Sequence, residues 1–181
     1  MKQEQIEGKN VVIEALRGRR KVKKILLAEG LKVDEAVRLI EKKAGEKDIP
    51  RQRITRKELE QLATTRAHQG VIAYVEPFQY TSLTNLLASL KNVSEEPFLL
   101  LLDGITDPQN FGSLLRSADA AGVQGVIIPK RRTAPLTASV CKASAGAVEH
   151  LSIVQVPNLV MVIKILKDKG MWIVGGSEKA E

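Results

Sequence analysis

One short polar segment carries the residue types that could do chemistry. The segment DGITDPQNFGSLLRSADAAG, residues 103–122, follows the apolar run FLLLL and places Asp107, Pro108 and Asn110 ahead of a helical stretch that contains Arg116. A guanidinium in such a place can stabilise developing negative charge, and an asparagine amide can hold a neighbouring side chain or a backbone turn. The question is whether Arg116 is an ordinary surface residue or a functional residue of an active or binding site.

Each of these residues also has a purely structural explanation. Asp107 and Pro108 make a favourable turn, Asn110 is a favourable helix N-cap, and Arg116 could pair with Asp119 along the helix surface. These explanations account for the residues one at a time but not for their combination. We therefore keep Asn110 and Arg116 as candidate catalytic residues.

The second half of the chain alternates short apolar runs with helical stretches. We expect strands at 98–102, 125–129, 152–156 and 171–174, and helices at 111–121, 138–148 and 159–169. The alternation predicts an α/β fold with a parallel sheet and helices on its faces. Ligands bind such sheets in the loops beyond the carboxyl ends of the strands, and residues 103–122 begin at one of those ends.

The first half of the chain predicts a separate, small α/β domain. Helical patterns cover NVVIEALRG, KVDEAVRLIEKKAGEKD and TRKELEQLA, and strand patterns cover KKILLAE and GVIAYVE. Thr55 and Glu58 form a capping box for the third helix. Residues 78–96, with one short helix in TSLTNLLASL, are interpreted as a linker. The predicted organisation is a first domain at 1–77, a linker at 78–96 and a second domain at 97–181.

Positive charge is concentrated in the first half. Residues 1–80 hold 18 Lys and Arg against 12 Asp and Glu, whereas the remaining residues hold 10 against 9. The densest group is RGRRKVKK, residues 17–24. Such clusters attract a polyanion and bind its phosphates without reading sequence, although a solvated face is the alternative. Aromatic residues make up only 3% of the chain, so recognition of folded RNA by shape and backbone fits better than a base-stacking platform.

The composition argues against several other classes of protein. Cys141 is the one cysteine and there are two histidines, so neither an internal disulfide nor a metal site is expected, and Cys141 is predicted to be a small core residue. No stretch approaches the roughly 20 apolar residues of a membrane span, and the polar N-terminus lacks the apolar core of a signal peptide. We expect a cytoplasmic protein without a membrane partner.

The segment DGITDPQNFGSLLRSADAAGVQGVIIP resembles the first sequence motif of the SpoU (TrmH-like) RNA ribose 2′-O-methyltransferases of the SPOUT superfamily. The resemblance continues through TASVCKASAGAVEHLSIVQVPNL. In the first half, EGKNVVIEALRG and AHQGVIAYVEP resemble the substrate-binding domain of family members that modify large-subunit ribosomal RNA. The resemblance therefore covers nearly the whole chain, and it implies a small RNA-binding domain followed by a SPOUT domain of the trefoil-knot type.

The resemblance implies that a methyl group is transferred from S-adenosylmethionine to a ribose 2′-hydroxyl, with a guanosine of large-subunit ribosomal RNA as the expected target. A tRNA 2′-O-methyltransferase and a catalytically silent RNA-binding protein are the alternatives. Asn110 and Arg116 are placed in the active site. Gly175 and Gly176, which follow a predicted strand, are candidate cofactor-binding positions. The candidate RNA-binding residues are Arg17, Arg19, Arg20, Lys21, Lys23, Lys24, His68, Lys130, Arg131 and Arg132.

Methyl transfer of this kind is an in-line displacement, which demands orientation of the hydroxyl and help with its proton. Because the pKa of free arginine lies far above neutral pH, we expect Arg116 to orient the ribose or a phosphate and to stabilise developing negative charge. Family members continue with two further motifs that complete the knot and most of the cofactor pocket, and they pair as homodimers through the knotted domain. The sequence ends at GGSEKAE, before both motifs, so we expect a C-terminally truncated chain, either a fragment or a short relative.

Overall fold

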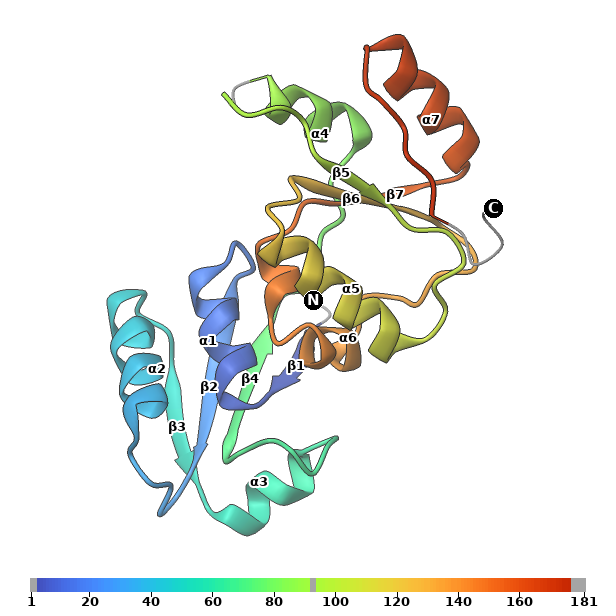
Figure 1. Ribbon diagram of the computed structural model, residues 1–181. Helices are drawn as coiled ribbons and strands as arrows, with labels where there is room; N and C mark the ends of the chain where they lie inside the picture. Colours follow the sequence, from blue (N-terminus) through green and yellow to red (C-terminus); the bar gives the residue numbers. More distant parts are fainter. Residues whose placement is uncertain (1–2, 92–93, 177–181) are drawn as a thin grey trace.

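The described part of the chain forms two sheets, one in each half (Figure 1). The computed structural model describes residues 3–91 and 94–176. Across the first sheet the strands follow the order β1 (Glu4–Glu7), β4 (Val71–Val75), β2 (Val22–Ala28) and β3 (Arg51–Ile54). Within the described ranges, no helix is both long and apolar enough to span a membrane.

The first sheet is covered by helices on both faces. The helices α1 (Lys9–Arg17) and α2 (Glu35–Glu46) lie over one face, and α3 (Arg56–Leu62) lies over the other. Neighbouring residues of β2 serve opposite faces, as a strand requires: Ile25 packs with the α1 and α2 side, and Leu26 packs with Leu59 of α3. The predicted capping box is confirmed, because Thr55 and Glu58 each accept a hydrogen bond from the other's backbone N–H.

The second sheet consists of three parallel strands, β5 (Leu99–Leu101), β6 (Gly125–Pro129) and β7 (Ile153–Val156). The helices α5 (Pro108–Ala120) and α6 (Ala138–Ala143) lie on one face, and α4 (Leu83–Leu90) and α7 (Leu159–Asp168) lie on the other (Figure 1). In β6, Val126 and Ile128 belong to the core beneath α5 and α6, whereas Ile127 belongs to the core beneath α4 and α7. The predicted parallel α/β architecture is confirmed.

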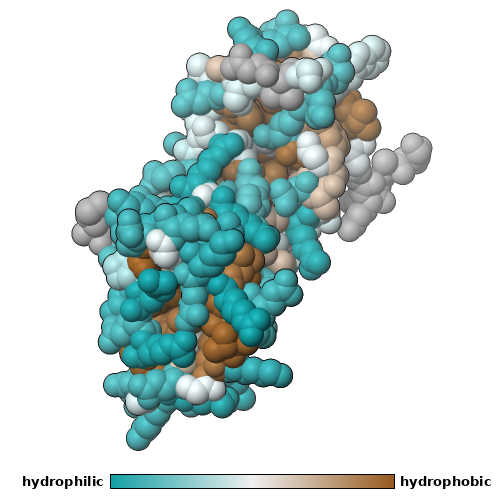
Figure 2. Space-filling view, turned by 90° about the vertical axis from the view of Figure 1, so that its left-hand side faces the viewer, coloured by the Kyte–Doolittle hydropathy of each residue, from teal (hydrophilic) through white to brown (hydrophobic). Residues whose placement is uncertain are grey.

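The two halves share one continuous apolar core. It runs from Ile6 and Val12 in the first half to Phe111 and Cys141 in the second. The helix α6 lies against β1, and the 3-10 turn η1 (Ala147–Glu149) lies against α1. The two halves therefore meet through packed helices and strands. On the outside, hydrophilic side chains cover most of the face shown in Figure 2, and apolar residues are exposed between them.

Two predicted elements differ from the structure. The helix predicted at 138–148 stops at Ala143, because Ala145 and Gly146 adopt positive φ angles of 51° and 91° and break the helical run. Residues 171–174 form no strand, although Met171 and Ile173 pack onto the sheet side and the alternation is that of a strand. The prediction of a strand at 171–174 is therefore wrong: apolar residues alternate there, but the segment pairs with no neighbouring strand among the described residues.

The predicted linker contains a packed element of the second half. The side chain of Leu86 in α4 is buried, and a Cβ atom built at Gly125 would meet its methyl groups at 2.6 Å. Residues 78–96 are therefore more than a free connection, and residues 92–93 of this stretch lie outside the described ranges. The last five residues of the predicted second domain, 177–181, also lie outside them.

Candidate functional site

The helix α5 is started by Asp107. Pro108 occupies the first helical position, where no N–H is needed, so the preceding residue becomes the N-cap. The Asp107 carboxylate accepts a hydrogen bond from the Asn110 backbone N–H at 2.7 Å. The prediction that Asn110 caps the helix is therefore wrong. The Asn110 side chain is exposed and is not used to begin the helix.

Close packing on α6 fixes the position of α5. Phe111, Leu115 and Ala118 bury one side of α5. A Cβ atom at Gly112 would stand 2.3 Å from the Ala143 Cβ and 2.8 Å from the Ser144 backbone nitrogen. Only glycine allows the two helices to approach so closely.

Asn110 and Arg116 are presented separately. Both are exposed, and six residues along an α-helix correspond to about 9 Å along the axis and about 120° around it. No hydrogen bond joins their side chains, and Arg116 forms no ion pair with Asp119 or with any other described residue. The pair cannot act by direct contact with each other in this arrangement, but both side chains are accessible to a substrate.

A basic loop lies beside the start of α5. The loops after the parallel strands β5 and β6 leave the sheet at the same edge, which we call the carboxyl edge (residues 103–107 and 130–137). The Ala134 backbone N–H donates to the Ile105 carbonyl at 2.8 Å and holds the two loops together. Lys130, Arg131 and Arg132 are exposed on the second loop. Asn110, in the first turn of α5, and three predicted RNA-binding residues are thus carried by two neighbouring segments of the carboxyl edge.

The carboxyl edge also contains one buried polar atom without a partner. The hydroxyl of Thr133 is buried and makes no hydrogen bond within the described structure. An unsatisfied buried hydroxyl costs free energy, so it marks a position where a bound group could supply the missing partner. Sequence reasoning did not single out Thr133, because its type and spacing are ordinary for a loop.

The predicted cofactor-binding glycines do not form a cradle. Gly175 and Gly176 are exposed, and a Cβ atom at either one would meet nothing within 4 Å. The described residues around them therefore do not fit S-adenosylmethionine, and we assign no catalytic step to it at these positions. Within residues 3–91 and 94–176, no three His, Cys, Asp or Glu side chains are grouped as metal ligands.

Arg20 is a correction to the predicted RNA-binding set. Its side chain is only 5% exposed and lies between Glu4 and Glu149. One guanidinium nitrogen also donates to the Cys141 sulfur at 3.5 Å. The guanidinium bonds both carboxylate oxygens of Glu149 and reaches Glu4 at 2.9 Å. It is therefore an internal link between the two halves, and its charge is taken up by two carboxylates. Burial raises the pKa of Cys141 to about 11, although Arg20 opposes the shift, so this thiol stays protonated at neutral pH.

The other members of the RGRRKVKK cluster divide into two groups. Arg17 pairs with Glu14 at 2.8 Å, and Lys23 pairs with Glu76 at 2.5 Å. Arg19 and Lys21 are exposed and form no ion pair with any described residue, while Lys24 is half-buried on β2. Arg19 and Lys21 are thus the members most available to a polyanion.

His68 belongs to a loop that is organised by a buried glutamate. Glu7 accepts five hydrogen bonds: two each from Thr64 and Thr65, through their N–H and hydroxyl groups, and one from Gln5. Burial favours a higher pKa for Glu7, but these hydrogen bonds outweigh it and lower the pKa to about 2. The carboxylate therefore stays charged and holds the loop rigidly.

The loop lines a shallow, basic hollow of about 470 Å³. His68 uses its Nδ1 atom to accept the Gly70 N–H at 3.1 Å, which leaves Nε2 for a partner. Arg56 and Arg66 lie in the same hollow. The sequence analysis did not identify Arg66 as a candidate, because a single arginine next to two threonines does not indicate a binding site. Only the structure shows that the buried Glu7 holds its loop in place.

Comparison with known proteins is consistent over both halves. Residues 97–181 match the model of the SpoU rRNA Methylase family, and residues 5–81 match the model described as RNA 2'-O ribose methyltransferase substrate binding. A Bacillus subtilis protein, YacO, described as a TrmH family tRNA/rRNA methyltransferase, is 43% identical over 175 residues, which cover 96% of this chain and 69% of that protein. A Staphylococcus aureus protein of the same description is 42% identical over 170 residues, covering 94% of this chain and 68% of its own length.

Solved structures share the fold. An AdoMet-bound rRNA methyltransferase from Sinorhizobium meliloti aligns with a TM-score of 0.66 at 23% identity and covers 91% of this chain. The SpoU methyltransferase AviRb from Streptomyces viridochromogenes, also in complex with AdoMet, aligns with a TM-score of 0.67 at 23% identity and covers 93%. The chain spans 58% and 60% of the lengths of these two proteins.

Proposed function

Because the chain belongs to the SpoU rRNA methylase family, we propose that it acts in methyl transfer from S-adenosylmethionine to a ribose 2′-hydroxyl of RNA. The observation that carries the proposal is the carboxyl edge. There the helix α5, held close to α6 at Gly112, carries Asn110 in its first turn next to the basic loop 130–132 and exposes Arg116 farther along its length. Parallel α/β sheets bind their ligands at this edge. The AdoMet bound in two structural relatives supports the choice of methyl donor.

In the proposed mechanism Arg116 acts on the RNA. A guanidinium stays protonated, so it orients the ribose or an adjacent phosphate and stabilises the negative charge that develops on the 2′-oxygen. Asn110 lies on a different side of α5 from Arg116. Its amide forms hydrogen bonds either with another group of the substrate or with the backbone of the turn before α5. The exposed side chains of Lys130, Arg131 and Arg132 bind the RNA backbone, which positions the ribose without reading sequence.

We propose large-subunit ribosomal RNA as the substrate, with a guanosine as the modified nucleotide. The match of residues 5–81 to the family's substrate-binding model supports an RNA partner. The curated relatives are described as tRNA/rRNA methyltransferases, so transfer RNA is the competing substrate. Incubation of the protein with radiolabelled S-adenosylmethionine and each purified RNA distinguishes them: label in ribosomal RNA alone supports the proposal, and label in tRNA alone overturns its substrate.

We further propose that the protein works in the cytoplasm as a homodimer. Support for pairing comes from apolar side chains that remain uncovered. Val160 and Met161 on α7 are 62% and 63% exposed, and Trp172 and Val174 are 94% exposed. Sedimentation equilibrium tests the dimer, and a mass of 19.9 kDa at all concentrations would overturn it.

The variant Arg116→Ala tests the catalytic assignment. Removing one preorganised donor to a developing negative charge typically lowers turnover by about 100-fold or more. We expect a loss of that size in methyl transfer, with Lys164→Ala on α7 as the control that keeps the wild-type rate. Transfer by Arg116→Ala at the wild-type rate would contradict the assignment. RNA binding without any methyl transfer by the wild-type protein would instead support the catalytically silent alternative.

A further inference from the structure

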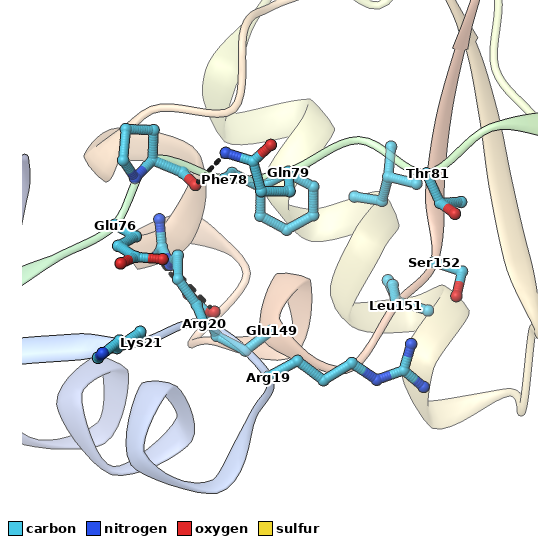
Figure 3. A pocket seen from close by; sticks show the side chains of 12 residues that line it. Arg19, Arg20, Lys21, Glu76, Phe78, Gln79, Thr81, Glu149, Leu151 and Ser152 are labelled. Atoms are coloured by element: carbon cyan, nitrogen blue, oxygen red, sulfur yellow. Dashed lines mark hydrogen bonds and ion pairs between the residues drawn. The ribbon is translucent and has the colours of Figure 1, made fainter. Parts of the chain in front are cut away.

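A second hollow lies where the two halves meet, away from the carboxyl edge. It is a cavity of about 190 Å³ lined by residues from three segments (Figure 3). They are residues 19–21 before β2, residues 76–79 and Thr81 after β4, and Glu149 with residues 151–153 from the end of η1 to the start of β7. These last residues are at the amino end of β7, so the cavity opens at the opposite end of that strand from the carboxyl edge. It is a separate site from the one that presents Asn110 and Arg116.

One wall of the cavity is aromatic. Phe78 is half-buried, and its ring meets the ring of Tyr80 edge-on, with 5.6 Å between the centroids. That contact fixes the orientation of Phe78. The Gln79 side-chain nitrogen donates to the Pro77 carbonyl at 3.2 Å, which leaves the amide oxygen of Gln79 as an acceptor (Figure 3). A flat ring with polar edge atoms would find a stacking surface and a hydrogen-bond partner here.

The charges around the cavity are uneven. Glu149 is neutralised by Arg20, and Glu76 is neutralised by Lys23. Arg19 and Lys21 also line the cavity, and neither has an ion-pair partner among the described residues. The ion-pair partners of the two glutamates are thus Arg20 and Lys23, not Arg19 or Lys21. The mouth of the cavity therefore carries two available positive charges, which suit phosphate groups.

We propose that this cavity binds one unpaired nucleotide of single-stranded RNA, with its base against Phe78 and its flanking phosphates on Arg19 and Lys21. The inference rests on the proposed function in that RNA is taken as the partner. The small volume supports a single base, because pockets for drug-sized molecules measure about 300–1,000 Å³. Scarce aromatic residues exclude a long stacking platform, but one placed ring is enough for one base.

RNA binding by the whole chain tests the cavity. The probe is a single-stranded RNA of about 10 nucleotides that carries the fluorescent base 2-aminopurine, whose emission falls when it stacks. We expect Phe78→Leu to raise the Kd about 5-fold or more, since the ring contributes one base–aromatic stack, and to abolish the loss of emission. Phe98→Leu is the matched control, because Phe98 is a 52% exposed aromatic residue on another surface.

The two cations are tested by the salt dependence of the same binding reaction. Each phosphate contact to a single strand contributes about 0.7 to the slope of log K against log salt concentration, so Arg19→Gln with Lys21→Gln should reduce the slope by about 1.4. Lys32→Gln with Arg38→Gln, an exposed pair at α2, is the control. These variants change exposed side chains only, so they test the site even if Phe78→Leu destabilises the fold.

The outcomes separate this site from the proposed function. Unchanged Kd, emission and salt slope in the variants, or no RNA binding by the wild-type chain, would overturn the nucleotide site. A guanosine monophosphate that binds as tightly as the RNA and displaces it would also overturn it, because the site would then serve free nucleotides. If the binding results hold but no methyl transfer is found, the proposed function fails and the cavity remains an RNA site.

Discussion

Glu7 and Glu149 are both buried carboxylates, one within the first half and one at the junction of the halves. Glu149 is held by the Arg20 guanidinium, and burial still raises its pKa, although Arg20 opposes the shift. Glu7 has no cation within ion-pairing distance among the described residues and accepts five hydrogen bonds, and its pKa falls to about 2. At Glu7 the hydrogen bonds outweigh the effect of burial on the pKa, whereas at the more deeply buried Glu149 the ion pair with Arg20 does not.

The two glutamates also serve different ends. Glu7 orders the loop that presents Arg66 and His68 to solvent. Glu149 joins β1 and η1 through Arg20 and so fixes the junction where the cavity beside Phe78 lies. One carboxylate shapes a surface, and the other sets how the two halves meet.

Loss of Arg20 should give the largest effect. Arg20→Met leaves Glu149 buried without its cation, and breaking a buried pair in this way costs about 3–5 kcal/mol. Chemical denaturation at pH 7 measures the change, and Arg19→Met, at the exposed neighbouring position, should change the free energy of unfolding by less than about 0.5 kcal/mol. Replacing both Arg20 and Glu149 by methionine should restore most of the loss, and equal losses for single and double variants would contradict the account.

Acid should weaken the fold through Glu7. Its pKa is about 2 in the folded chain against 4.5 ordinarily. The contribution of Glu7 is therefore complete above about pH 5 and is lost as the pH falls toward 2. At about 1.4 kcal/mol per pKa unit, it amounts to roughly 3 kcal/mol at most. Unfolding free energies of the wild type and Glu7→Gln, compared from pH 7 to pH 2, should converge, and a constant difference would refute the low pKa.

The close approach of the halves predicts an intermediate effect. A Cβ atom at Gly18 would stand 2.7 Å from the Glu149 Cβ and 2.9 Å from its carbonyl oxygen. Gly18→Ala should therefore destabilise the chain by about 2 kcal/mol through overpacking. Gly45→Ala, inside α2 and with only the Arg51 guanidinium 3.5 Å away, should be neutral or stabilising. A neutral Gly18→Ala would mean that the junction is looser than described.

The smallest effect is expected when one donor to Glu7 is removed. Thr65→Val deletes the hydroxyl that donates at 2.7 Å and keeps the backbone donor at 3.0 Å. A hydrogen bond to a charged group contributes about 1.5 kcal/mol, so thermal and chemical unfolding should show a loss of that order. Ser82→Ala, which removes a cap of α4, provides a comparison in which the acceptor is uncharged. A larger loss for Ser82→Ala would contradict the special role given to Glu7.

Much of the fold could be predicted because its information is local. Apolar spacing located the helices, and the Thr55–Glu58 capping box identified the start of α3. The edge strands β1 and β3 were missed, since EQIE and RQRI are short, polar and only partly buried. Pro108 marks the first residue of α5, which makes Asp107 the N-cap. The sequence analysis named Asn110 as the N-cap instead, because asparagine is generally favourable at that position.

The candidate site was less accessible because contacts between distant residues decide it. Arg20 looked like its neighbours in a basic run, and nothing nearby in the sequence shows that Glu149, 129 residues away, would bury it. Phe78 lies in a stretch that was interpreted as a linker, and its cavity exists only where the two halves meet. Sequence identified Arg116 through a resemblance, whereas packing at Gly112 explains how its helix is held.

Mapping of ribose 2′-O-methylation across all cellular RNA, with and without the gene for this protein, tests the central claim most directly. We predict that one methylated position, a guanosine in large-subunit ribosomal RNA, is lost on deletion. Its methylation should return with the wild-type gene but not with one that encodes Arg116→Ala. An unchanged methylation map after deletion would contradict the account.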